Sequence, residues 1–94
     1  MFLKRRTSEA ARHDPYRHIY QSARWHRFSK NYLKKNRLCK ACLNKGITEI
    51  ALVVDHVVPL VTWIPSGGDP YDTTNMQPLS KRCHSVKTRK ENKG

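Results

Sequence analysis

Aspartate, histidine and asparagine side chains in the second half of the sequence have types and spacing that suit acid–base and metal chemistry. Asp55 and His56 are adjacent in DHVVPL, Asn75 opens NMQPL, and His84 lies in CHSVKT. A histidine is the usual side chain to take a proton near neutral pH, and a carboxylate beside it can hold a hard divalent cation. A lone Asp-His pair in a strand is more often structural, so the whole set has to be considered together.

The cysteines form a second group with metal-ligand spacing. Cys39 and Cys42 stand in CKAC, which a Lys-Gly turn follows, as is typical of one half of a zinc knuckle. Cys83 would supply a third thiolate, but Ser80 stands where a second CxxC would have its first cysteine. The fourth position could be filled by water, by the Ser80 hydroxyl, or by a histidine of the N-terminal segment, His13 or His18. Alternatively, no metal is bound and the thiols pack as small apolar groups.

The chain is strongly basic. Its 94 residues include 19 Lys and Arg against 7 Asp and Glu, a net charge of +12. Such a charge on a small chain indicates a polyanionic partner, with nucleic acid as the first candidate. A membrane surface is a weaker candidate, since there is no long apolar run and no strongly amphipathic apolar helix. The opening MFLKRRTS lacks the apolar core of a signal peptide, so we expect a cytoplasmic protein with reduced thiols, which favours metal over disulfides.

The length allows one small domain, and only 37% of the residues are hydrophobic, so a metal staple would help its stability. We predict a basic N-terminal arm over residues 1–21, a folded domain over 22–90 and a short tail over 91–94. Within YRHIYQSARWHRFSKNYLKKN, apolar residues fall on two opposite helical faces, which predicts a break near Gln21-Ser22. Ser22 would then cap a helix of about 23–35, with a buried stripe of Trp25, Phe28 and Tyr32.

The second half of the sequence predicts strands followed by a helix. TEIALVVDHVVPL is a β-branched run that Pro59 ends, and IPSGGDPYDTTN reads as a loop. A second strand or turn follows, and a helix is predicted from about Ser80. The sequence therefore indicates the α+β class.

Taken together, five segments resemble one family. RWHRFSKNYL, CKAC, VVDHVVPL, GGDPYDTTNMQPL and CHSVKT resemble, in this order, the HNH endonucleases of the ββα-metal fold, and most closely the small phage-type members with a CxxC knuckle. The matching segments span about residues 22–90. The resemblance implies a ββα-metal core with an N-terminal helix and a treble-clef-like zinc knuckle.

The resemblance also implies roles for individual residues. His56 matches the general base that activates water, and Asp55 and His84 match the ligands of one catalytic divalent ion, for which magnesium, manganese and nickel are compatible. Asn75 matches the residue that orients the His56 loop, and its side-chain carbonyl could accept a hydrogen bond from His56. Three of the four structural zinc ligands are matched, by Cys39, Cys42 and Cys83, while Ser80 departs from the pattern.

The implied function is a metal-dependent, largely sequence-tolerant DNA endonuclease that nicks or cuts both strands, encoded by a phage or by its bacterial host. Kinship further implies a role in phage DNA packaging beside the terminase, and one active site is expected in a monomer or weak dimer. Basic residues around the last helix could contact the flanking phosphates, namely Lys81, Arg82, Lys87 and Arg89. The alternative is a zinc-containing nucleic-acid-binding module without catalysis, which has no need of Asp55, His56, Asn75 and His84.

Overall fold

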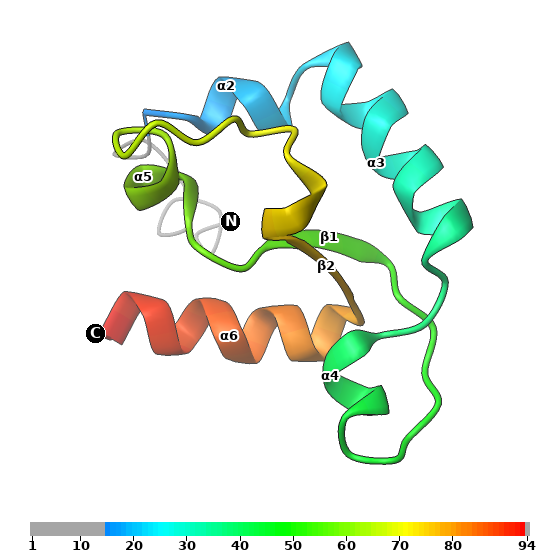
Figure 1. Cartoon of the computed structure of the whole chain (residues 1–94). Coiled ribbons are helices and arrows are strands. Elements are labelled where there is room, and N and C mark those ends of the chain that lie inside the picture. Colours follow the sequence, from blue (N-terminus) through cyan, green and yellow to red (C-terminus); the bar gives the residue numbers. More distant parts are fainter. Residues whose placement is uncertain (1–14, 94) are drawn as a thin grey trace, which may run out of the picture.

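An antiparallel hairpin lies at the centre of the computed structural model, which describes residues 15–93 (Figure 1). Strand β1 is Val53–His56 and strand β2 is Met76–Leu79. Their register pairs Asp55 with Gln77 and His56 with Met76. The predicted strand therefore forms, but it stops at His56, several residues before Pro59.

The N-terminal region forms two helices with a break at the predicted place. Helix α2 is Arg17–Tyr20 and helix α3 is Ala23–Lys35. Ser22 caps α3, because its hydroxyl accepts a hydrogen bond from Trp25 N at 3.1 Å. The same hydroxyl donates to Ile19 O at 2.7 Å and closes the turn between the helices.

The end of the predicted arm belongs structurally to the folded domain. Residues 17–20 are helical, and Ile19 and Tyr20 pack against the main hydrophobic core. Apolar residues at these positions explain the docking, since burying them removes their surface from water. At the other end of the chain, helix α6 is Lys81–Lys93 and continues past residue 90, the predicted end of the folded domain.

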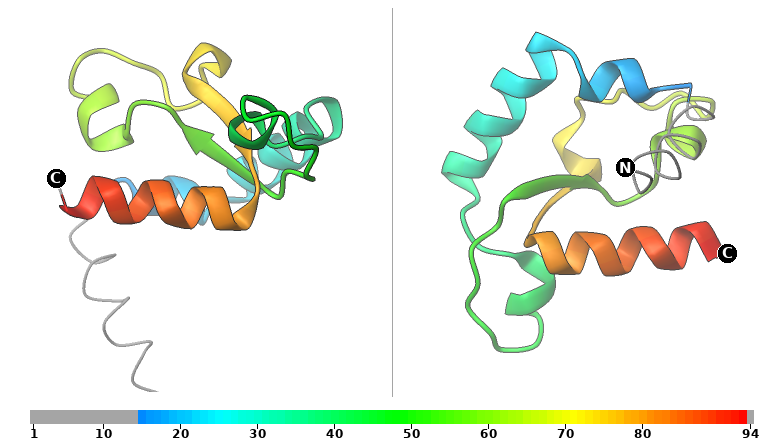
Figure 2. Two further views of the ribbon diagram at one scale, coloured as in Figure 1. Left: turned by 90° about the horizontal axis from the view of Figure 1, so that it is seen from below. Right: turned by 180° about the vertical axis from the view of Figure 1, so that it is seen from behind.

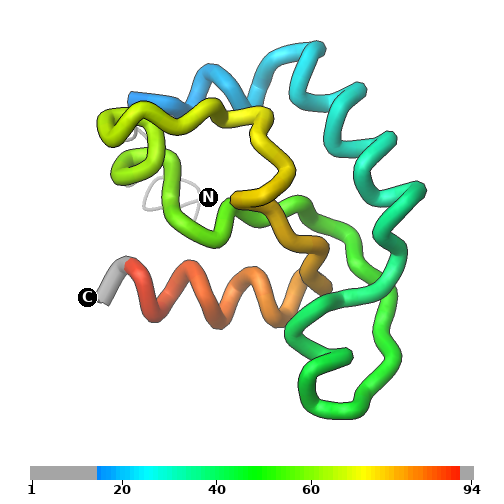
Figure 3. Tube along the Cα trace, viewed as in Figure 1, coloured from blue at the N-terminus to red at the C-terminus, as the bar shows by residue number. Residues whose placement is uncertain are grey.

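Two helices flank the strands. Viewed from below, α6 crosses the hairpin on one side, and the loop that carries α5 projects on the other (Figure 2). The knuckle contributes a single turn, helix α4, which is Lys40–Leu43. The tube trace shows α4 beside the start of α6, at the end of the hairpin remote from α2 (Figure 3).

The connection between the strands contains α5, which is Leu60–Trp63, and a 3-10 helix η1, which is Thr73–Asn75. The sequence predicts only a loop here, because so short an apolar segment shows no helical period. Gly68 packs directly on Trp63, and a Cβ atom at this position would overlap the indole ring. Trp63 Nε1 in turn donates to Asp69 O at 2.8 Å, which fixes the backbone just before Pro70.

The core has two parts. The larger cluster contains Trp25, Val54 and Met76, with half-buried apolar residues of α2, α3 and the long loop around it. The predicted stripe of α3 is therefore confirmed as core. The smaller cluster contains Cys39, Cys42 and Leu79. Within residues 15–93, no helix has both the length and the apolar character that a membrane span requires.

Candidate active site and cysteine cluster

Asp55 is buried in β1, and its two carboxylate oxygens face different partners. Oδ2 accepts a hydrogen bond from Gln77 Nε2 at 2.9 Å, across the strand pair, and lies 3.2 Å from Lys87 Nζ. Oδ1 faces His84 Nε2 at 3.6 Å, too far for a hydrogen bond. A carboxylate oxygen and an imidazole nitrogen that face each other in this way can serve as two ligands of one divalent ion.

The two predicted ligands of the catalytic ion are thus brought together from β1 and α6. The His84 side chain is 38% exposed and that of Asp55 is 8% exposed, so the pair opens to solvent on the histidine side. Water or a phosphate oxygen could complete the coordination from there, as is usual for catalytic sites.

Lys87 lies elsewhere than the sequence predicts. The prediction places it among the phosphate contacts, but its ammonium turns inward, lies 3.2 Å from Asp55 Oδ2 and donates to His56 O at 3.2 Å. It also pairs with Glu91. Burial opposes the charged form, but Glu91 and Asp55 outweigh burial and raise the pKa of Lys87. This side chain therefore helps to orient Asp55.

His56 ends β1 and is only 4% exposed. Its Nε2 lies 2.8 Å from Pro70 O, and its Nδ1 lies 3.0 Å from the hydroxyl of Tyr20. The Trp25 ring covers it with a centroid separation of 5.3 Å. Burial lowers the pKa of His56, against the opposing effects of Pro70 and Asp55, so the imidazole is neutral at neutral pH. A neutral imidazole is the form that a general base requires.

Asn75 does not accept a hydrogen bond from His56, contrary to the prediction. Its Oδ1 accepts from Val58 N at 2.8 Å and its Nδ2 donates to Val58 O at 3.0 Å. The backbone of Asn75 also accepts from Val57 N at 2.9 Å. The hairpin register sets this geometry, because it places Asn75 opposite the residues that follow His56. Asn75 thus holds the loop after the histidine, and a backbone carbonyl of the long loop holds the ring itself.

A cleft with a volume of about 530 Å³ unites these groups. Residues of α2, α3, β1 and α6 line it, among them Tyr20, Asp55, His56 and His84. Neighbouring residues of a strand point to opposite faces. Both Asp55 and His56 border the same cleft because the strand pairing ends at this point.

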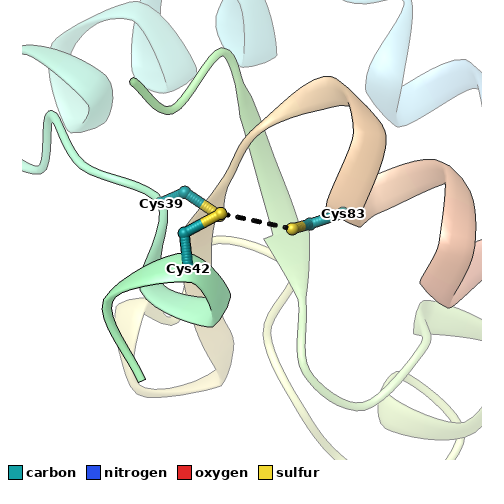
Figure 4. A group of neighbouring side chains, drawn as sticks. All are labelled: Cys39, Cys42 and Cys83. Carbon is teal, nitrogen blue, oxygen red and sulfur yellow. Dashed lines mark hydrogen bonds between the residues drawn. The ribbon is translucent and has the colours of Figure 1, made fainter. Parts of the chain in front are cut away.

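The three cysteines converge from the knuckle and from α6 (Figure 4). Their sulfur atoms all lie within 4.8 Å of one another, and Cys42 Sγ lies 3.7 Å from Cys83 Sγ. All three are free thiols. Three sulfurs at these separations can act as ligands of one zinc ion. Within the part of the chain that the structure describes, the cluster consists of Cys39, Cys42 and Cys83.

Ser80 is buried beside this cluster and serves both the helix and the thiols. Its Oγ accepts a hydrogen bond from Cys83 N at 3.2 Å, in the manner of an N-cap of α6. Burial alone would raise the pKa of Cys39, but hydrogen bonds from the Ser80 and Cys42 amides and side chains lower it to about 6. The serine therefore stabilises the Cys39 thiolate without a metal bond.

The other candidates for the fourth zinc ligand differ in where they lie relative to the cysteine cluster. His18 is exposed on α2, and Figure 1 shows this helix far from α4. His13 lies outside the described residues. The sequence did not single out Glu49, yet its Oε1 lies 3.9 Å from Cys42 Sγ.

The remaining predicted DNA contacts lie on the surface of α6, where Lys81, Arg82 and Arg89 are exposed. The sequence missed three further partners of the site: Tyr20, Gln77 and the Pro70 carbonyl. Strand pairing alone could have suggested Gln77, which stands opposite Asp55. Tyr20 and Pro70 could not be found in this way, because only the packing of distant segments brings them to His56.

Comparisons with known proteins agree with this arrangement. The family model described as HNH endonuclease matches residues 39–90. The chain is also similar to the crystal structure of the HNH endonuclease of the deep-sea thermophilic bacteriophage GVE2 with a manganese ion. The two chains are 30% identical, the alignment covers 94% of each, and the TM-score is 0.70. The comparison with curated proteins gives no match. The predicted resemblance and fold class are confirmed: the chain belongs to the HNH endonuclease family.

Proposed function

We propose that this chain hydrolyses DNA phosphodiester bonds with His56 as general base and one divalent ion held by Asp55 and His84. The main support is that Asp55 Oδ1 and His84 Nε2 face each other at 3.6 Å. They do so in the same cleft as the buried, neutral His56. Hydrolysis needs an activated water and a cation near the phosphate, and this cleft offers a base and two ligands.

The residues present fit a divalent ion. Asp55 Oδ1 points at His84, whereas Gln77 and Lys87 engage Oδ2, so one oxygen of the carboxylate is oriented toward the ion position. When bound, the ion would stabilise negative charge on the phosphate and the leaving oxygen. The manganese ion in the crystal structure of the GVE2 endonuclease supports manganese as the ion of this site. Magnesium and nickel are also compatible with the Asp and His ligands.

The protein groups have separable tasks. His56 accepts the proton of the attacking water, and Trp25 and the Pro70 carbonyl hold its ring. Asn75 holds the loop that follows. Exposed cations of α6 bind the phosphates that flank the cleavage site, at Lys81, Arg82 and Arg89. The cysteine cluster would bind a structural zinc ion and tie the knuckle to α6.

The biological setting follows from kinship. The likeness to a phage endonuclease supports a phage-encoded enzyme. We further propose that it works in the cytoplasm of the bacterial host, in DNA packaging beside the terminase. A single candidate active site among residues 15–93 further favours nicking by a monomer, with double-strand cleavage through a weak dimer or two successive visits.

A plasmid assay tests the proposal. Purified protein is incubated with supercoiled DNA in EDTA or in magnesium, manganese or nickel, beside His56→Ala. We expect metal-dependent nicking that falls by about 10²–10⁴-fold in the variant. The control is His18→Ala, which removes an exposed histidine of α2 that does not line the cleft. Plasmid that is bound but left intact in every metal would indicate the non-catalytic zinc-containing module instead.

A further inference from the structure

Both ring nitrogens of His56 lie within hydrogen-bond distance of another group of the protein. Nε2 lies 2.8 Å from the carbonyl oxygen of Pro70, and Nδ1 lies 3.0 Å from the hydroxyl of Tyr20. The residue is 4% exposed, and Trp25 covers the ring with a centroid 5.3 Å away. A water molecule therefore cannot reach a nitrogen of the base directly in this arrangement.

The two contacts define which nitrogen is the basic one. A carbonyl oxygen only accepts hydrogen bonds, so Nε2 must carry the hydrogen and donate to Pro70. In a neutral imidazole the other nitrogen, Nδ1, then holds the lone pair. The contact with Tyr20 must accordingly run from the tyrosine hydroxyl to Nδ1. The atom that would take a proton from water is thus bonded to Tyr20.

The tyrosine is held in place and reaches the cleft. Its ring packs edge-on against Trp25, with centroids 5.4 Å apart, and belongs to the main core. Tyr20 also lines the cleft together with Asp55 and His84. A hydroxyl oxygen that donates to Nδ1 still carries lone pairs, so a water molecule of the cleft that donated to this oxygen would be linked to Nδ1 through the tyrosine.

We propose that Tyr20 is a catalytic residue that relays the proton of the attacking water to His56. The inference rests on the proposed role of His56 as general base. In this step the water proton moves to the Tyr20 oxygen while the tyrosine proton moves to Nδ1. The electron pair of the broken water O–H bond forms the bond to phosphorus, and the leaving oxygen departs with its own pair and takes a proton from solvent.

The same contacts suit the state after transfer. The imidazolium has hydrogens on both nitrogens, so Nε2 still donates to Pro70 and Nδ1 now donates to Tyr20. The two hydrogen bonds persist and only the direction of the second one reverses. The ring does not have to move during the step.

The test is Tyr20→Phe, which keeps the aromatic packing and removes the hydroxyl. The matched control is Tyr32→Phe, which removes a tyrosine hydroxyl from a residue packed on the same core. We expect single-turnover plasmid nicking to slow by roughly 10- to 100-fold in Tyr20→Phe, less than the full loss of the base, with no change in the control. Manganese affinity, measured by calorimetry without DNA, should remain that of the wild type in both variants.

Two further measurements separate a relay from a structural role. The ¹⁵N resonance of Nδ1 in neutral His56 should shift toward the value of an unbonded imine nitrogen in Tyr20→Phe. Nicking rates in mixtures of light and heavy water should curve for the wild type, where two protons move, and become linear in the variant.

Three results would overturn the relay. Nicking at the wild-type rate in Tyr20→Phe would show that the hydroxyl is dispensable, and faster nicking would show that it blocks the base. Slower nicking with equally weakened manganese binding would assign a structural role. If the wild-type protein does not nick DNA in any metal, the proposed function itself fails. This result is distinguishable from a failure of the relay because it does not depend on the Tyr20→Phe variant.

Discussion

His56 is held by groups from three separate parts of the chain. The Tyr20 hydroxyl comes from α2, the Trp25 ring from α3, and the Pro70 carbonyl from the long loop. Burial in this setting lowers the pKa of the imidazole and keeps it neutral. Asp55, the preceding residue of the chain, has partners on β2 and α6. The adjacent residues His56 and Asp55 thus have separate surroundings, as their proposed roles of base and metal ligand require.

The neutral state of His56 gives a stability prediction. Its folded pKa lies below the ordinary value of 6.5, so below this pH the unfolded chain binds more protons than the folded one. The free energy of unfolding should therefore fall as the pH drops below about 6.5, by at most about 1.4 kcal/mol per pH unit for one proton. Urea unfolding of the wild type and of His56→Gln from pH 7.5 to pH 5 measures this effect.

His26→Gln serves as the control, because this histidine is exposed on α3. In His26→Gln the free energy of unfolding should depend on pH as in the wild type. In His56→Gln the free energy of unfolding should change less with pH. If the free energy of unfolding changed equally with pH in all three proteins, His56 would accept its proton equally well in the folded and the unfolded chain.

At the scale of the elements, α6 joins the two functional regions. Its first residues carry Cys83 toward the knuckle and His84 toward Asp55. Successive residues of a helix project about 100° apart, so one helix can present neighbouring side chains to different sites. Ser80 caps this helix and also donates to Cys39, which gives a physical account of a serine at the place of a fourth cysteine.

Ser80→Cys should therefore have opposite effects with and without metal. In EDTA the loss of the cap should cost about 1 kcal/mol, a fall in Tm of about 4–8 °C for a domain of this size. With zinc, a fourth thiolate completes the site, so zinc affinity and Tm should exceed those of the wild type. Calorimetric melting with and without zinc, together with the zinc content, provides the measurement.

Ser85→Cys is the matched control, since it adds one thiol at an exposed position of the same helix. It should leave zinc content unchanged. If Ser80→Cys also leaves zinc content and Tm unchanged, another group already fills the fourth position, and Glu49 is the first to examine.

For the whole molecule the net charge is +12, and within residues 15–93 the helices α3 and α6, which both line the cleft, carry exposed Lys and Arg side chains. Strand β1 of the hairpin lines part of the cleft, and the cysteine cluster lies at the α4 end of the hairpin. The lining of the cleft includes no Lys or Arg among the described residues, so a DNA backbone at the cleft would meet the cations of both helices on the surfaces outside it. Phosphate contacts of this kind give affinity with little sequence preference.

The affinity for DNA should accordingly fall steeply with salt. Neutralising Lys81, Arg82 and Arg89 to glutamine should lower the slope of log K against log salt by about 0.9 for each phosphate that the variant no longer binds. The comparison variant replaces Arg27, Lys30 and Lys34 of α3 with glutamine and so removes the same charge. It should alter the slope less. Fluorescence anisotropy with duplex DNA over a salt series, in EDTA to prevent cleavage, measures both; a larger effect of the α3 variant would place the main DNA contact on that helix.

The sequence by itself determined the family, the α+β class, and the break before α3 with its Ser22 cap. It also determined the two groups of candidate site residues, the Asp, His and Asn set and the cysteines. These features depend on local spacing and on side-chain type, which a linear pattern records. Only the tertiary structure decided that Tyr20 and Pro70 hold His56, that Lys87 turns inward to Asp55, and that Asn75 binds the backbone of Val58 instead of the imidazole. Each of these contacts joins residues far apart in the chain. Their geometry depends on how the hairpin, the long loop and the helices pack, and no local pattern contains that information.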